Sequence, residues 1–437
     1  MSAVLQQIDT APVDTGAQTH RALRFLTAGS VDDGKSTLIG RLLFDSRAIL
    51  ADQLDALERR AAGSAIDLSL LTDGLEAERE QGITIDVAYR YFATRQRKFI
   101  IADAPGHEQY TRNMVTAAAG SDAAVVLVDI TKLDWRQQPV KLLPQTRRHA
   151  LLAQLLRVPS IVFAVNKLDA IDAEARAAFD AVRASLEAFA AQAGIEVAGI
   201  VPVSALRGDN VTAASPVWTW YAGPTLLELL HALPAADERH DGALSVPVQY
   251  VAKIGDGANP KRIFWGRIAH GRVRVGDTVQ VFPSGQQAQV AELRRAGEPV
   301  DVVEAGQSAG LVLDRELDIS RGDWFSTPGT LGSTQRFTAT LAWLDTEAAQ
   351  IGRKYWVRHG HRWVQARITA IDSRRDIHTL EDHEAHELGV NEIGRVQIET
   401  QAPLPVEAYL ENRVGGALIV VDPASNRTSG ALLVSQA

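Results

Sequence analysis

A short segment near the amino terminus combines a lysine and a serine with two adjacent carboxylates. Residues 29–36 read Gly-Ser-Val-Asp-Asp-Gly-Lys-Ser, which fits the pattern G-x-x-x-x-G-K-[ST]. In such a loop the backbone amides and the positive end of the following helix bind phosphate, Lys35 reaches the β- and γ-phosphates, and the Ser36 hydroxyl suits Mg²⁺. The pattern predicts a nucleotide site, and it leaves Asp32 and Asp33 beside a polyanion.

Three further polar segments end apolar runs that are typical of buried strands. DAPGH (103–107) follows KFIIAD, NKLD (166–169) ends SIVFAVN, and SAL (204–206) ends GIVPVSA. Because open α/β sheets bind ligands at the carboxyl edge of their strands, we expect these segments to converge there. Asp103 would then hold the magnesium shell, and the Gly106 amide would meet the γ-phosphate.

The segment GITID (82–86) precedes VAYRYFA, a mixed run that suits the edge of a sheet. It lies between the phosphate loop and DAPGH, so Thr84 is a candidate second magnesium ligand that binds only when the γ-phosphate is present. Such a segment is expected to order with the nucleoside triphosphate and to relax after hydrolysis.

The base expected in this site is guanine. Asp169 can only accept hydrogen bonds as a carboxylate, and guanine offers it two adjacent donors, N1–H and the 2-amino group. Adenine offers none on that edge and would leave a desolvated carboxylate unpaired, which a site of this kind rejects by roughly 10⁴-fold or more.

Composition restricts the remaining possibilities. The 437 residues suffice for two to four domains, and 46% of them are apolar, as in soluble proteins with real cores. The net charge of −8 argues against a broad surface for nucleic acid, and the absence of cysteine excludes disulfides and thiolate chemistry. No apolar run approaches the roughly 18 residues that cross a bilayer. The first 20 residues lack a secretory pattern, so a cytoplasmic location is expected.

Two changes of pattern divide the chain. Residues 21–236 alternate apolar strands with helical periods, which predicts an α/β P-loop domain with a mostly parallel sheet. Beyond a Pro-, Gly- and charge-rich linker at 233–245, short strands punctuated by glycine predict two antiparallel β-barrels, 245–330 and 335–437. Residues 1–20 are expected to form a flexible tail.

These motifs, followed by two barrels, resemble the translational GTPases typified by elongation factor Tu, over nearly the whole chain from residue 21. The resemblance implies that His107 positions the attacking water, that Val31 and Ile83 form an apolar gate, and that Asp32 lies near the water or a monovalent cation. The implied catalytic residues are His107, Lys35 and Asp32. The implied metal ligands are Ser36, Thr84 and Asp103. The implied nucleotide contacts are Gly29, Ser30, Val31, Asp32, Asp33, Gly34, Lys35, Ser36, Thr37, Gly82, Ile83, Thr84, Asp103, Ala104, Pro105, Gly106, His107, Asn166, Lys167, Asp169, Ser204, Ala205 and Leu206.

Finer wording resembles one branch of that family, the GTPase (large) subunits of bacterial heterodimeric sulfate adenylyltransferase, or ATP sulfurylase. Ser30 and Asp33 replace two histidines usual in elongation factors, and the branch wording includes LLTDGLEAEREQGITIDVAYRYF, HEQYTRNM, QTRRH, FWGRIAHGRVRVGD and YLENRVGGALIVVDPASNRTSGAL. The resemblance implies that GTP hydrolysis here drives a smaller catalytic subunit, which makes adenosine 5′-phosphosulfate from ATP and sulfate. We find no S-G-G-x-D-S loop and no second phosphate loop, so we expect the GTPase alone.

Several alternatives stay open. A translational GTPase that delivers aminoacyl-tRNA is the rival, disfavoured by the acidic balance, by Asp33 and by ENRVGGALIVVDP; a regulatory switch without an enzymatic partner fits the site but not this wording. Asp33 is either a loop carboxylate that is merely solvated or salt-bridged, or a residue with a function that the sequence does not reveal. The segment 130–145 is longer than usual in this branch and is either a partner contact or a surface insertion. The histidine pairs 359/361 and 383/386 lack a ligand-rich context for zinc.

Overall fold

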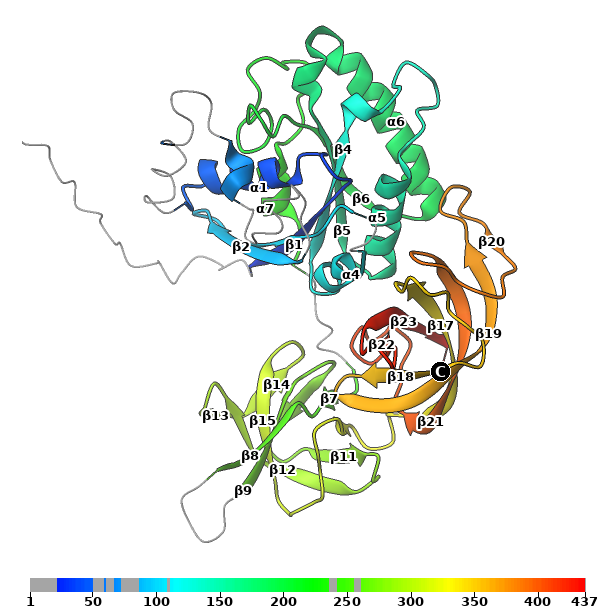
Figure 1. The fold of residues 1–437 in the computed structure, drawn as a ribbon. Coiled ribbons are helices and arrows are strands. Elements are labelled where there is room, and N and C mark those ends of the chain that lie inside the picture. The colour runs from blue at the N-terminus through cyan, green and yellow to red at the C-terminus, as the bar shows by residue number, and fades with distance from the viewer. Residues whose placement is uncertain are drawn as a thin grey trace, which may run out of the picture. The chain divides into compact units, whose positions relative to one another are not determined.

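The computed structural model describes residues 22–49, 59, 67–71, 86–107, 111–235, 242–254 and 261–436. They belong to two compact units, one ending at Ala235 and one beginning at Ala236 (Figure 1). The expected tail and the switch residues Gly82, Ile83 and Thr84 lie outside the described residues. Within the described part, no helix has the length and apolar composition that a membrane span requires.

The first unit is built on a six-stranded sheet with the order β2-β3-β1-β4-β5-β6. Only β2 runs antiparallel to its neighbour; all other pairs are parallel. The strands are β1 (Leu23–Ala28), β2 (Ala88–Ala93), β3 (Lys98–Asp103), β4 (Ala123–Asp129), β5 (Ser160–Asn166) and β6 (Val197–Pro202). The α-helices are α1 (Lys35–Asp45), α4 (Thr111–Ala119), α5 (Pro144–Leu155), α6 (Ala175–Ala193) and α7 (Leu226–Ala232). Short 3₁₀ turns are η1 (Leu68–Leu71), η3 (Ile130–Lys132), η4 (Leu168–Ala170) and η5 (Asp172–Glu174).

Helices cover both faces of this sheet, which explains the sequence of its central strands. Every residue of β4 and β5 is buried, as expected for parallel strands packed on two sides. Helices α1 and α7 pack in one apolar core with the sheet, and α4, α5 and α6 lie on its other side (Figure 1). The edge strand β2 alternates between exposed residues and residues that are partly or, at Phe92, fully buried, and its place at the edge of the sheet confirms the prediction from its mixed composition.

The second unit contains two antiparallel barrels, so the expected fold class is confirmed. In the first, strands follow the order β7-β16-β11-β12-β15-β9-β8 around one apolar core, with β13 paired to β12 and a separate β10–β14 pair. The strands of the second barrel follow the order β18-β22-β23-β17-β21-β19. The barrel closes where β18 pairs with β19, and β20 forms a further pair with β19. The strands of the first barrel are β7 (Ser245–Pro247), β8 (Tyr250–Ile254), β9 (Lys261–Arg267), β10 (Arg272–Arg274), β11 (Thr278–Phe282), β12 (Gln287–Arg295), β13 (Glu298–Val300), β14 (Val302–Glu304), β15 (Ser308–Leu313) and β16 (Trp324–Ser326). Those of the second are β17 (Thr334–Trp343), β18 (Lys354–His359), β19 (Arg362–Arg375), β20 (Asp382–His383), β21 (Ile393–Leu404), β22 (Ala417–Val421) and β23 (Thr428–Gln436).

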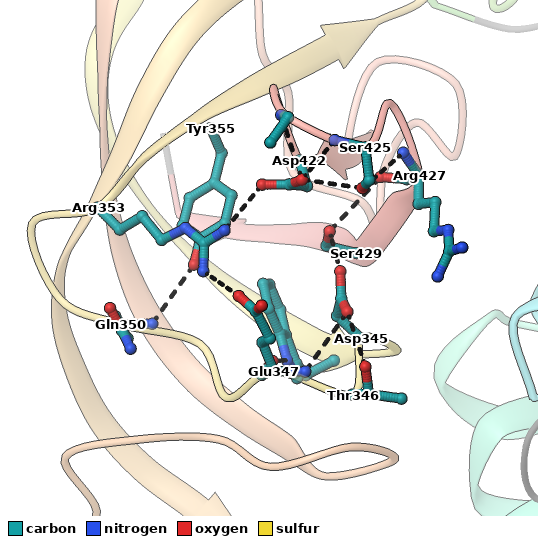
Figure 2. A network of polar contacts seen from close by, with 12 residues as sticks. Asp345, Thr346, Glu347, Gln350, Arg353, Tyr355, Asp422, Ser425, Arg427 and Ser429 are labelled. Carbon is teal, nitrogen blue, oxygen red and sulfur yellow. Dashed lines mark hydrogen bonds and ion pairs between the residues drawn. The ribbon is translucent and has the colours of Figure 1, made fainter.

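A polar network ties loops of the second barrel together (Figure 2). The Arg353 guanidinium donates to Glu347 Oε2 at 2.7 Å and to Asp422 Oδ1 at 2.8 Å. Asp422 Oδ2 also accepts from the backbone N–H and the hydroxyl of Ser425, both at 2.8 Å. We call Glu347, Arg353, Asp422 and Ser425 the barrel network. Because the donors of Ser425 and Arg353 satisfy the Asp422 carboxylate, holding these loops together is a sufficient role for the network.

Candidate nucleotide-binding site

The phosphate loop connects β1 to α1 through backbone conformations that few residues adopt. Asp32 has φ of 64°, and Gly34, the N-cap of α1, has φ of 91°. A Cβ on Gly34 would lie only 2.4 Å from Asn166 Nδ2. Glycine is therefore required at this position twice, by its backbone angle and by the close approach of a second loop.

Lys35 begins α1 with only 7% of its surface exposed. Its Nζ donates to the carbonyl oxygens of Gly29, at 3.0 Å, and Ser30, at 2.8 Å. Burial lowers the pKa of Lys35, and the nearby Asp103 and Asp33 partly oppose that shift. A desolvated ammonium held by uncharged carbonyls is well suited to bind a phosphate.

Asp33 is buried completely, so the salt-bridged reading is correct and the solvated one is wrong. Its Oδ2 accepts the backbone N–H of Ser30 at 2.6 Å, and its Oδ1 lies 2.8 Å from Lys132 Nζ. Lys132 also donates to the Val31 carbonyl at 2.6 Å. The carboxylate of Asp33 thus closes the phosphate loop on itself.

The DAPGH segment leaves β3 and packs against the phosphate loop. The Asp103 side chain is 2% exposed, and Thr27 Oγ1 donates to its Oδ1 at 3.3 Å. Gly106 lies so close that a Cβ would fall 2.3 Å from Lys35 Nζ and 2.6 Å from the Gly29 carbonyl oxygen. Its own carbonyl accepts from Gln145 Nε2 of α5 at 3.4 Å.

The NKLD and SAL segments meet at the ends of β5 and β6. Asn166 is 2% exposed; its Nδ2 donates to the Asp33 carbonyl at 2.8 Å, and its Oδ1 accepts the Ala205 N–H at 3.0 Å. The Asp169 carboxylate is 13% exposed, and Arg207 Nε lies 4.0 Å from its Oδ2. Asn166 therefore joins three loops, and Asp169 lies three residues beyond it in the same loop.

All described segments expected at the site converge on one edge of the sheet. Pro105 and Ala104 are buried, His107, Ser36 and Thr37 are partly exposed, and Leu206 is 65% exposed. Strand β6 ends at Pro202, so SAL lies in the turn beyond it rather than in the strand.

Three charged residues of this edge were missed from the sequence: Asp129, the last residue of β4, Lys132, which ends the following 3₁₀ turn, and Arg207, which follows SAL. Lys167 Nζ lies 2.8 Å from Asp129 Oδ2, and Lys132 Nζ lies 3.8 Å from it; both are charge contacts without hydrogen-bond geometry. The signal available was position alone, because β4, like its parallel neighbours, must also end at the ligand-binding edge.

The donor set fits a nucleoside triphosphate with magnesium. Ser36 supplies a hydroxyl and Asp103 a carboxylate, the hard oxygen ligands that Mg²⁺ takes. Gly29, Gly34 and Gly106 keep side chains out of the space between the loops, since a Cβ on each would come within 3.1 Å of a neighbouring loop or strand. Lys35 adds one buried cation on the phosphate side.

Comparison with protein families agrees with this geometry. Residues 20–236 match the elongation factor Tu GTP-binding domain, residues 262–326 match elongation factor Tu domain 2, and residues 336–435 match the GTP-eEF1A C-terminal domain-like family. Fold and site together define a GTPase of the elongation factor Tu class.

Curated relatives identify the branch. The chain is 45% identical to sulfate adenylyltransferase subunit 1 of Laribacter hongkongensis, over 96% of this chain and 86% of that protein. It is 44% identical to sulfate adenylyltransferase subunit 1 of Psychromonas ingrahamii, over 94% of this chain and 87% of that protein. The bifunctional enzyme CysN/CysC of Xylella fastidiosa is 46% identical over 94% of this chain, which spans 65% of that longer protein. The chain belongs to the sulfate adenylyltransferase subunit 1 family.

Proposed function

We propose that this chain is the GTP-hydrolysing subunit of a sulfate adenylyltransferase. GTP hydrolysis in its first unit would drive a partner catalytic subunit to form adenosine 5′-phosphosulfate from ATP and sulfate, a step of sulfate assimilation. The observation that carries this proposal is the convergence of the phosphate loop, DAPGH, NKLD and SAL on one sheet edge in a chain 45% identical to subunit 1.

Each part of the site has a proposed task. The loop amides and Lys35 bind the phosphates, and Asp169 accepts the two donors on the edge of guanine. His107 orients the attacking water, with Asp32 near it. Ser36, Asp103 and Thr84 would hold Mg²⁺, which when bound neutralises charge that develops on the phosphate oxygens. Thr84 belongs to the segment outside the described residues, so its task rests on the sequence alone.

The remaining expectations also stay proposals. The partner would be the smaller catalytic subunit, bound as a heterodimer, and the complex would work in the cytoplasm. The domain bounds 21–236, 245–330 and 335–437 are likewise predictions of the sequence.

A single assay tests both the nucleotide and the coupling. The purified chain is combined with the catalytic subunit, ATP and sulfate, and adenylylsulfate formation is measured with GTP or with xanthosine triphosphate. GTP should stimulate the wild-type complex. In Asp169→Asn the side-chain amide can donate to xanthine, so the stimulation should pass from GTP to xanthosine triphosphate.

The matched control is Asp172→Asn, three residues beyond Asp169 along the same chain segment, which should keep the preference for GTP. A wild-type complex whose product formation ignores GTP would contradict the coupling. An Asp169→Asn variant that still prefers GTP would contradict the assignment of the base site.

A further inference from the structure

The charged side chains behind the phosphate loop form a chain of alternating sign. Asp33 contacts Lys132, Lys132 lies near Asp129, and Asp129 contacts Lys167. Both carboxylates are completely buried, whereas the lysine side chains are 33% and 36% exposed. We call these four residues the loop network. It runs from the phosphate loop to NKLD, the loop expected to hold the guanine.

The local fold places Lys132 in this network. The Asp129 side chain caps the 3₁₀ turn Ile130–Lys132 by accepting the Thr131 N–H at 2.9 Å. Ile130, the first residue of this turn, and Leu133, the residue after it, are both buried and hold the turn against the rest of the domain. The backbone is therefore held on both sides of Lys132, and its ammonium reaches the phosphate loop 99 residues away in the sequence.

A buried carboxylate behind a phosphate site is an electrostatic liability. Without a partner, the charge of Asp33 would repel every phosphate that the loop binds, and it would remain desolvated. Lys132 cancels that charge at 2.8 Å, and through its bond to the Val31 carbonyl it also holds the far side of the loop. The loop can therefore bind phosphate although it carries two adjacent carboxylates. Asp32 is exposed to solvent, and the charge of Asp33 is neutralised by a lysine from outside the motif.

We propose that Lys132 is a positioning residue of the nucleotide site, which neutralises Asp33 and holds the phosphate loop in the form that binds nucleotide. The inference rests on the proposed function of that loop in binding GTP. Through Asp129 and Lys167 the same lysine links the phosphate side of the site to the base side. Lys132 does not touch the reacting atoms; it acts through Asp33 and the Val31 carbonyl.

The test is Lys132→Met, measured by the dissociation constants of GTP, GDP and guanosine. At an effective dielectric constant of about 20, one uncompensated charge about 8 Å from a phosphate charge weakens binding about 30-fold. We expect a loss of about this size for GTP. We expect a smaller loss for GDP and none for guanosine, because the repulsion acts on phosphates. In steady state the KM for GTP should rise while kcat changes little, as when an interaction equal in ground and transition states is removed.

Two further variants separate positioning from simple support of the fold. Lys132→Met combined with Asp33→Asn removes both charges and should recover most of the GTP affinity, since losing a buried pair is tolerated better than losing one partner. Lys132→Arg keeps the charge and should also recover much of it. Lys141→Met, an exposed lysine of the same β4–α5 connection, is the matched control and should bind as wild type.

The outcomes are distinct. Wild-type protein that binds no guanine nucleotide would overturn the proposed function, and this inference with it. Wild-type protein that binds GTP, with Lys132→Met equal to Lys141→Met, would overturn the inference alone. Equal losses for GTP and guanosine would make Lys132 a support of the whole fold, and so would a double variant no better than Lys132→Met; either result overturns the inference.

Discussion

The loop network and the barrel network both pair cations with carboxylates, but solvent reaches one carboxylate of the barrel network and neither carboxylate of the loop network. In the barrel network Arg353, whose side chain is 30% exposed, bridges two carboxylates, of which Glu347 is 72% exposed and Asp422 is 8% exposed. In the loop network the carboxylates of Asp33 and Asp129 are buried, and the lysines are the partly exposed members. The barrel network joins the β17–β18 connection to the β22–β23 connection, whereas the loop network joins the segments at the ends of β1, β4 and β5.

This contrast separates charges that fasten a fold from charges that prepare a site. Solvent meets most of the needs of an exposed pair, so the pair contributes little and costs little. A buried carboxylate carries a large desolvation cost, which at Asp422 is offset by Arg353 and by the two donors of Ser425. The loop network lies in loops that also contain strained backbone, with positive φ at Asp32, Gly34 and Lys167. Buried charge and strained backbone both cost stability, and their occurrence together is typical of a binding site.

The largest effect should come from a pair of glycines with the same backbone angle. Gly34 of the phosphate loop and Gly276 of the first barrel both have φ of 91°, but a Cβ meets Asn166 Nδ2 at 2.4 Å in the first case and nothing within 4 Å in the second. Gly276→Ala should therefore cost only the strain of a left-handed residue, about 1–2 kcal/mol. Gly34→Ala adds displacement of Asn166 and should weaken GTP binding by about 100-fold or more, as about 3 kcal/mol of lost positioning would.

Nucleotide titration and urea unfolding check both variants. Gly276→Ala serves as the control because it carries the same strain without the clash, and it should bind GTP as wild type. Equal GTP affinities in the two variants would show that the approach of Asn166 to the phosphate loop has no part in binding.

Much of this architecture could be predicted from the sequence, for identifiable physical reasons. The central strands β4 and β5 are nearly continuous apolar runs because both sheet faces are covered, and Gly34, Lys35 and Ser36 have a spacing that few other structures require. The salt bridge of Asp33 was one of the open readings, and its partner was not predicted. Lys132 is an ordinary lysine 99 residues away, and only the packing of the turn after β4 brings it to the loop. Long-range pairing of side chains leaves no periodic trace in a sequence.

A second test compares two buried histidines, one in each unit. Desolvation lowers the pKa of His149 in α5 to about 3, helped by the charges of Lys35 and Arg148. Desolvation also lowers the pKa of His359 in β18 to about 4, opposed by the hydrogen bond between its Nε2 and the Gly415 carbonyl. His359 also stacks on Trp324, with 4.8 Å between ring centroids.

Because both folded values lie below the unfolded value of 6.5, the unfolded chain takes up each proton first as the pH falls. Stability from this source is complete above pH 6.5 and falls by about 1.4 kcal/mol per pH unit for each histidine. The stability of both units should fall equally as the pH is lowered to about 4. Between about pH 4 and 3 only the first unit, which contains His149, should continue to lose stability through its histidine.

Hydrogen exchange at a series of pH values, read on peptides of each unit, measures these slopes separately. His149→Gln should flatten the slope of the first unit and leave that of the second, and His359→Gln should do the reverse. A slope unchanged by either substitution would mean that the imidazole in question is not a proton acceptor kept neutral by burial.

The smallest effect should come from the barrel network itself. Arg353→Met removes the cation between Glu347 and Asp422, but solvent reaches Glu347, and Ser425 still donates to Asp422. Because the Ser425 donors keep the buried Asp422 hydrogen-bonded and solvent reaches Glu347, we expect a loss of at most about 1 kcal/mol, or a fall in the thermal midpoint of at most about 4 °C. GTP affinity should be unchanged, in contrast to Lys132→Met, although each substitution removes one cation that lies within 4 Å of two carboxylates.

Arg336→Met is the control on the same barrel: the Arg336 side chain is 81% exposed, and Arg367 still donates to Glu399 after the substitution. If Arg353→Met weakened GTP binding as Lys132→Met is expected to, the effect of Lys132 would not come from its place beside the phosphate loop, and the contrast between the two networks would have no functional meaning.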